Sequence, residues 1–175
     1  MSEELKRFID RLKKDPAWTV FPSKELPELS SDPRAPQVSL PDDILYFYQL
    51  CGGMETNIRS DYDLAIQIVP ATGFNWAIKE IIGSLKDSAI NDYQDNILWT
   101  CYVLASVGTD EYLVIDLAPE RYGRCYFTEF YLLGCEGWTP IIAESFLGLL
   151  QRLEKAAAEP DKRFWETDNL GDAYD

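Results

Sequence analysis

Paired carboxylates are the side chains in this sequence best suited to holding a divalent cation. Asp61 and Asp63 are separated by one residue, so in an extended segment both side chains point to the same side. Oxygen ligands of this kind suit Mg²⁺ and Ca²⁺. Asp92 and Asp95 form a weaker pair among turn-forming residues. In a chain with 30 acidic residues such pairs arise by chance. We therefore expect solvated loops at both places, and neither a metal nor another cofactor.

Histidine is absent from the sequence. Since histidine is the usual general base near neutral pH and a frequent metal ligand, Ser-His-Asp systems, Cys-His systems and histidine-containing zinc sites are excluded. Neither GxxxxGK[ST] nor GxGxxG occurs, so the usual backbone cradles for phosphate are missing as well. Chemistry based on carboxylate, lysine or tyrosine stays open, but these absences predict that the protein is not an enzyme.

The charge balance points to the kind of partner. The chain of 175 residues carries 30 acids and 16 bases, a net charge of −14. Residues 42–135 alone hold 14 acids and 5 bases, so the surplus is not confined to the tail. Nucleic acids and anionic membranes attract Lys and Arg, and both would repel this chain. A basic protein partner suits the balance better.

The start of the chain is charged and amphipathic, with neither the apolar core of a signal peptide nor an apolar run long enough to span a bilayer. We therefore expect a cytoplasmic protein. Without an oxidising compartment or CxxC spacing, the cysteines are expected to be small buried thiols rather than a disulfide or metal set. These cysteines are Cys51, Cys101, Cys125 and Cys135.

The elements that must position any site follow from apolar periodicity and from Pro and Gly signals. A 3.6-residue repeat predicts helices at 3–14, at 41–51 with Pro41 at the first helical position and Gly52-Gly53 as a left-handed cap, at 74–84 and at 140–158. After a polar loop, β-branched and aromatic runs predict strands at 64–69, 97–107, 111–117 and 124–131. The fold class is therefore α+β, a single domain with a mainly antiparallel sheet flanked by helices. We place this domain at 1–160, with an extended Pro-rich connector at 20–39 and an acidic tail at 161–175, where Phe164 and Trp165 could dock on the body.

Four segments follow one another in a distinctive order. They are a Leu-Pro helix closed by glycines at 40–53 (LPDDILYFYQLCGG), an apolar strand ending in Asp at 108–116 (GTDEYLVID), the next strand at 123–126 (GRCY) and a closing helix at 143–150 (AESFLGLL). In this order the segments resemble Smi1/Knr4 (SUKH) domains. Cys51-Gly52 replaces the usual Asn-Gly, the connector is long and the tail is extra.

The resemblance implies an α+β fold without catalytic residues. Bacterial members are often immunity proteins that bind toxins, many of them nucleases, whereas fungal members are regulators linked to cell-wall synthesis. The acidic charge supports the first role independently, because nuclease clefts are basic and an acidic cover gains association rate from electrostatic steering. We therefore expect a toxin-neutralising immunity protein with a basic toxin domain as partner. The alternatives are a regulatory or scaffold protein with a non-toxin partner and, less favoured, an enzyme with a carboxylate-bound metal.

Exposed aromatics beside acids are expected to form the partner-binding surface, because Tyr and Trp dominate binding energy while carboxylates steer. The residues selected on this ground are Asp110, Glu111, Tyr112, Tyr122, Glu136 and Trp138. For Tyr112 and Trp138 the alternative is packing in the core. For Asp110 and Glu111 it is a plain turn, and Asp116 is expected to be structural, at an exposed strand position.

Overall fold

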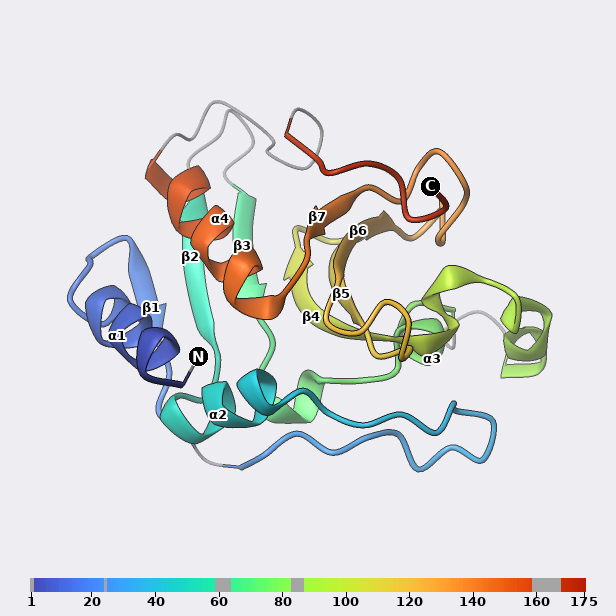
Figure 1. Cartoon of the computed structure of the whole chain (residues 1–175), viewed down its shortest axis with the longest axis horizontal. Coiled ribbons are helices and arrows are strands. Elements are labelled where there is room, and N and C mark those ends of the chain that lie inside the picture. Colours follow the sequence, from blue (N-terminus) through green and yellow to red (C-terminus); the bar gives the residue numbers. More distant parts are fainter. Residues whose placement is uncertain (1, 24, 59–63, 83–86, 159–167) are drawn as a thin grey trace.

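An antiparallel sheet of seven strands forms the centre of the molecule, and each strand pairs with its neighbours in sequence (Figure 1). The strands are Trp18–Val20 (β1), Met54–Ile58 (β2), Leu64–Ile68 (β3), Cys101–Val107 (β4), Glu111–Asp116 (β5), Cys125–Glu129 (β6) and Ile141–Ala143 (β7). This computed structural model describes residues 2–23, 25–58, 64–82, 87–158 and 168–175. The α+β class and the antiparallel sheet predicted from sequence are confirmed.

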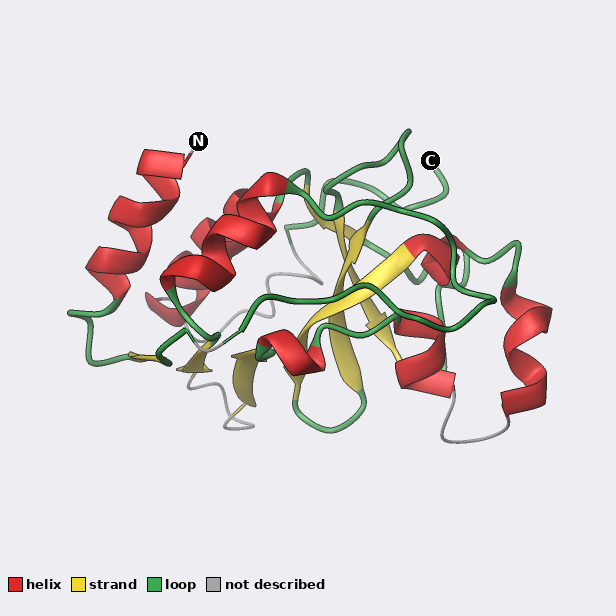
Figure 2. Cartoon of the chain, turned by 90° about the horizontal axis from the view of Figure 1, so that it is seen from below, coloured by secondary structure: helices red, strands yellow, loops and turns green. Residues whose placement is uncertain are grey.

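In the described residues, four α-helices and three short 3₁₀ helices pack around the sheet. They are Ser2–Leu12 (α1), Asp42–Leu50 (α2), Ala77–Ile82 (α3), Phe146–Ala158 (α4), Ala71–Gly73 (η1), Asp87–Tyr93 (η2) and Ile97–Thr100 (η3). Figure 1 shows α1 at one end of the long axis and α3 in the opposite half of the molecule, and Figure 2 shows the same helices from below. Arg11 and Glu154 form a 2.8 Å ion pair that joins α1 to α4. None of the helices in the described ranges is long and apolar enough to cross a bilayer.

Helix α2 lies where the sequence predicts it, but the residues at its two ends differ from the prediction. Pro41 is the extended residue before the helix, so the helix starts at Asp42 and the placement of Pro41 inside the helix is wrong. The predicted left-handed cap at Gly52-Gly53 is also wrong, because Cys51 already leaves the helix in an extended conformation. A positive φ, of 116°, does occur at Gly53, two residues after Cys51, where a Cβ would lie 2.8 Å from the Ile68 carbonyl oxygen.

Three short elements differ from the sequence prediction because polar contacts determine their conformation. Met54–Ile58 was predicted as polar loop but is strand β2, in which Thr56 takes a buried position and donates to the Ala17 carbonyl. Residues 97–100 were predicted as strand but form η3, since the Asn96 side chain accepts from the Leu98 N–H at 2.8 Å. Residues 140–145 were predicted as helix but contain β7, and the Ser145 hydroxyl accepts from the Gly148 N–H where α4 starts.

A row of aromatic rings links the helices to the sheet. The contacts run from Phe146 through Phe47, Tyr48 and Phe74 to Tyr102, with ring centroids 5.0, 5.0, 6.3 and 5.3 Å apart. All five side chains are buried. Aromatic contacts of this geometry add about 0.5–1.5 kcal/mol each beyond the area they bury, so the row holds α4, α2 and β4 in fixed positions.

Candidate partner-binding surface

The structure divides the six predicted site residues between the two ends of the β5–β6 hairpin. Asp110 and Glu111 lie where β5 starts, and the Asp110 carbonyl accepts from the Phe130 N–H at 2.8 Å. Glu111 pairs with Glu129 across the sheet, so the turn before β5 lies beside the loop that follows β6. Tyr122 lies in the connection at the far end of the same strands.

Tyr122 belongs to a loop organised by the buried side chain of Asp116. The Asp116 carboxylate accepts hydrogen bonds from the Thr100 hydroxyl at 2.6 Å, the Ala118 N–H at 2.9 Å, Arg121 Nε at 2.6 Å and the Tyr126 hydroxyl at 3.2 Å. Asp116 is completely buried, so its expected exposed position is wrong. A buried carboxylate needs this degree of pairing, because an uncompensated charge in the interior is strongly destabilising.

Tyr112 is neither a core residue nor a fully exposed one. Its side chain is half-buried and packs against the hydrophobic core. Burial raises the pKa of the Tyr112 phenol, and the nearby carboxylates of Asp110 and Glu80 raise this pKa further. Asp110 is exposed and Glu111 is half-buried. These three residues therefore line the margin of a surface whose exposed aromatic side chains lie on other segments.

The loop at 130–138 is held in place by contacts with η3. Asn96 donates from its side chain to the Leu133 carbonyl at 2.7 Å. Gly134 adopts a positive φ of 66°, and a Cβ on it would lie 2.5 Å from Asn96 Oδ1 and 2.8 Å from Leu98 Cγ. Only glycine fits this approach without displacing its neighbours. The loop therefore has a defined conformation although it contains no helix or strand.

The C-terminal segment, residues 168–175, lies along β7 and next to this loop (Figure 1). The Ile141 N–H donates to the Gly171 carbonyl at 2.9 Å, and the Leu170 N–H donates to the Ile141 carbonyl at 2.8 Å. The Tyr174 hydroxyl donates to the Gly134 carbonyl at 2.6 Å. The part of the acidic tail that the structure describes therefore covers the sheet edge at β7. Phe164 and Trp165 lie outside the described residues.

Together the two segments carry most of the large apolar side chains that are exposed in the described part of the chain. We call residues 129–138 and 168–175 the loop–tail surface. The exposed fractions of its large side chains are 81% for Tyr131, 63% for Trp138, 55% for Leu170 and 43% for Tyr174. The alternative that Trp138 packs in the core is therefore wrong. Exposed apolar groups gathered in this way mark interaction sites.

The charge of the loop–tail surface has one sign. Its two segments contain five acids and neither Lys nor Arg; the acids are Glu129, Glu136, Asp168, Asp172 and Asp175. Trp138, Glu129 and Asp172 border a cavity of about 480 Å³ that is floored by Phe127 and Pro140. Aromatic side chains beside a concave site and among carboxylates provide both an apolar contact and an attraction for cations.

Of the residues on the loop–tail surface, the sequence prediction includes Glu136 and Trp138 but not Tyr131, Leu170 and Tyr174. Tyr131 ends a run predicted as strand, where alternation would have allowed either face. The last two residues fall in a segment taken for a tail. Only the pairing of 169–173 with 139–141 brings them to the loop. Pro140 and Gly171, which flank this pairing, can be recognised in the sequence as turn-forming residues. They do not show that the two segments pair with each other.

The remaining candidates for chemistry are the four cysteines and the paired carboxylates. Cys51, Cys101 and Cys125 are buried as expected, and burial raises the pKa of the Cys51 thiol to about 11. Cys135 is exposed, which corrects the expectation that all four thiols are buried. Asp61 and Asp63 lie outside the described residues. Within the described ranges, no group of three or more His, Cys, Asp or Glu side chains is placed to share a metal ion.

An α+β domain that exposes aromatic side chains among carboxylates is typical of a protein-binding module. Comparison with known proteins identifies its family: 139 residues of the chain are 38% identical to immunity protein YokJ of Bacillus subtilis (strain 168), a match that covers 78% of each chain. The chain belongs to the family of this immunity protein. No protein-family model matches the chain, and no solved structure matches it either.

Proposed function

We propose that this protein is an immunity protein that neutralises a cognate bacterial toxin by binding it, without catalysing a reaction. The observation that carries the proposal is the 38% identity to an immunity protein over most of the chain. The four segments that resemble Smi1/Knr4 (SUKH) domains support membership of that superfamily. The toxin would meet the protein in the cytoplasm.

The contact is proposed to be the loop–tail surface together with its margin at Asp110, Glu111 and Tyr112. Trp138 and Tyr131 supply large amphipathic rings at low cost in conformational entropy, the usual property of residues that dominate binding energy. Since loop 130–138 and the C-terminal segment are already fixed by hydrogen bonds, little ordering is required on binding. Tyr122, at the far end of the hairpin, lies outside the proposed contact.

The toxin domain is proposed to be basic, with a nuclease as the class that fits best. A nuclease binds phosphate through Lys and Arg, so its cleft attracts the carboxylates of an acidic cover. A net charge of −14 would then raise the association rate at low salt. Neutralisation follows when the bound protein prevents nucleic acid from reaching the cleft.

The test is co-expression with the toxin encoded beside this gene, followed by measurement of the complex. We expect the protein to restore growth and to bind an inactive toxin variant with a 1:1 stoichiometry and a Kd in the nanomolar range. The association rate should fall steeply between 50 and 500 mM salt. A chain that neither protects nor binds contradicts the proposed function. Binding whose rate is independent of salt contradicts the basic partner alone.

A further inference from the structure

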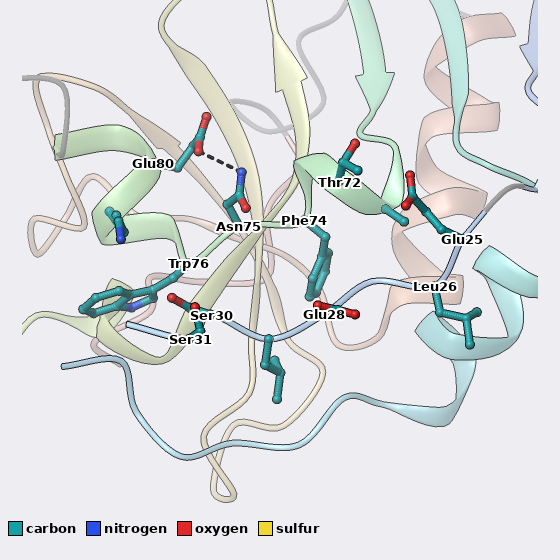
Figure 3. Close-up of a pocket in the computed structure, with 13 residues that line it drawn as sticks. Glu25, Leu26, Glu28, Ser30, Ser31, Thr72, Phe74, Asn75, Trp76 and Glu80 are labelled. Atoms are coloured by element: carbon teal, nitrogen blue, oxygen red, sulfur yellow. Dashed lines mark hydrogen bonds between the residues drawn. The ribbon is translucent and has the colours of Figure 1, made fainter. Parts of the chain in front are cut away.

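A groove runs between the connector and the segment that leads into α3, away from the loop–tail surface. Figure 3 shows its lining, with residues 25–31 on one side and 71–80 on the other. Its volume is about 910 Å³, and an adjoining cavity of about 310 Å³ shares Glu25 and Ala71 with it. We call this continuous depression the connector groove.

The connector leaves its main chain available along the groove. No hydrogen bond joins the backbone of residues 25–29 to any other described residue, although Ser30 N–H donates to the Tyr102 hydroxyl at 3.1 Å just beyond them. The segment adopts neither helix nor strand. Unpaired N–H and C=O groups on an extended backbone can pair with an extended segment of another protein, as at the edge of a sheet.

The floor of the groove is fixed by the core. Phe74 stacks on Tyr102 with ring centroids 5.3 Å apart, and Trp76 Nε1 donates to the Trp99 carbonyl at 2.7 Å. Both Phe74 and Trp76 are buried, whereas Leu26 on the rim is 47% exposed. A ligand in the groove would therefore meet a rigid apolar floor and one flexible apolar side chain.

The charges along the groove are unbalanced. Glu25, Glu28 and Glu80 all expose their side chains. Among the described lining residues Lys79 is the only cation, and its Nζ lies 3.0 Å from Oδ2 of Asp32, which also pairs with Arg34 at 2.7 Å. The charge of Lys79 is thus neutralised locally, while the three glutamates remain to attract cations.

We propose that the connector groove binds an extended segment of the toxin that carries Lys or Arg side chains. The carbonyl groups of residues 25–29, and the N–H groups of these residues other than Pro27, pair with the backbone of this segment, and Glu25 and Glu28 bind its cations. This proposal rests on the proposed function and adds a second contact to the loop–tail surface.

The test compares two double variants with the same change in net charge. Glu25→Gln/Glu28→Gln removes groove carboxylates that form no ion pair with another described residue, and Asp92→Asn/Asp95→Asn removes two exposed carboxylates on and after η2. For an inactive toxin variant at 50 mM salt, we expect the groove variant to lower the association rate 3- to 10-fold. The control should change this rate less than 2-fold. Equal rates for the two variants overturn the groove proposal, whereas failure of the wild-type chain to bind toxin contradicts the proposed function instead.

A peptide probe tests the pairing itself. An acetylated and amidated seven-residue peptide of alternating Lys and Val, its Glu–Val counterpart and an N-methylated Lys–Val version are titrated into the ¹⁵N-labelled full chain. We expect the Lys–Val peptide to shift the amide signals of Glu25, Leu26, Glu28 and Leu29, the Glu–Val peptide to shift none and the N-methylated peptide to bind at least 5-fold more weakly. Shifts confined to the loop–tail surface, or equal binding by the N-methylated peptide, overturn the proposal.

Discussion

The loop–tail surface and the connector groove are both acidic, but they are built in opposite ways. In the loop–tail surface the main chain is satisfied internally, by the Asn96 bond to Leu133 and the Tyr174 bond to Gly134, and large side chains point outward. In the connector groove the large side chains, Phe74 and Trp76, point inward and the main chain of 25–29 is left unpaired. The first arrangement suits side-chain contacts with a folded surface, and the second suits pairing with an extended segment.

Replacing Trp138, on the loop–tail surface, is expected to have the largest effect on toxin binding. Trp138→Ala is expected to weaken toxin binding by about 2–4 kcal/mol, the range of a dominant interface residue, mainly through faster dissociation. Stability should hardly change, because the side chain is 63% exposed. Tyr122→Ala is the matched control, an exposed aromatic at the far end of the hairpin. Surface plasmon resonance with an inactive toxin measures both, and equal losses would remove the distinction between the two ends.

A pair of glycine variants tests whether the loop at 130–138 is rigid. Both Gly134→Ala and Gly137→Ala impose a positive φ on alanine, at a cost of about 1–2 kcal/mol. Only Gly134→Ala also forces a Cβ against Asn96 and Leu98, which should add about 1–3 kcal/mol of overpacking. Urea unfolding measures the difference. If the two variants are equally destabilised, the loop moves to accommodate the added Cβ and does not form a rigid surface.

The hydroxyl of Tyr174 offers a smaller test of the same surface. Tyr174→Phe removes the bond to Gly134 and the 3.4 Å contact from the Ile97 N–H, so we expect a loss of about 1 kcal/mol in the free energy of unfolding. Hydrogen exchange at 131–138 should quicken at the same time. Tyr131→Phe, at an 81% exposed position, serves as control and should leave both quantities unchanged. Unaltered exchange in Tyr174→Phe would show that the C-terminal segment does not restrain the loop.

The groove side is expected to respond to acid through Asp32. The side-chain hydrogen bond from Arg34, with further bonds from the Arg34 N–H and from Lys79, holds the pKa of Asp32 well below its ordinary value. The folded state therefore binds this proton more weakly than the unfolded state, so the stability from Asp32 is present above its ordinary pKa and is lost as pH falls below it. We expect the free energies of unfolding of wild type and Asp32→Asn to differ by a constant amount from pH 5 to 7 and to converge below about pH 4. Urea titrations across this range measure the difference, and a gap that stays constant to pH 2.5 contradicts the assigned contacts.

Local patterns predicted the fold where apolar periodicity and a stop signal agree. The helix after Pro41, the strands ending at Val107 and Asp116 and the apolar stripe of α4 are examples. The errors occur where one polar contact decides between conformations, as with Thr56 in β2 and Asn96 before η3. Such contacts join residues far apart in sequence or depend on a single side-chain orientation. Apolar periodicity predicts neither the distant partner nor the orientation.

The candidate site could be predicted only in part for the same reason. Trp138 and Glu136 stand out as an aromatic beside an acid. Tyr174 joins them only because residues 169–173 pair with the strand region at 139–141, a contact between segments about 30 residues apart. The connector groove could not be inferred at all, since a Pro-rich run predicts an extended chain but not the residues it faces.

Hydrogen–deuterium exchange of the complex with an inactive toxin tests whether the toxin binds at the loop–tail surface. We expect slowed exchange at 129–138 and 168–175 when the toxin binds, with the Tyr122 loop at 117–124 unchanged. Protection confined to 117–124, or to α1 and α4, would contradict it and would place the toxin on another face of the protein.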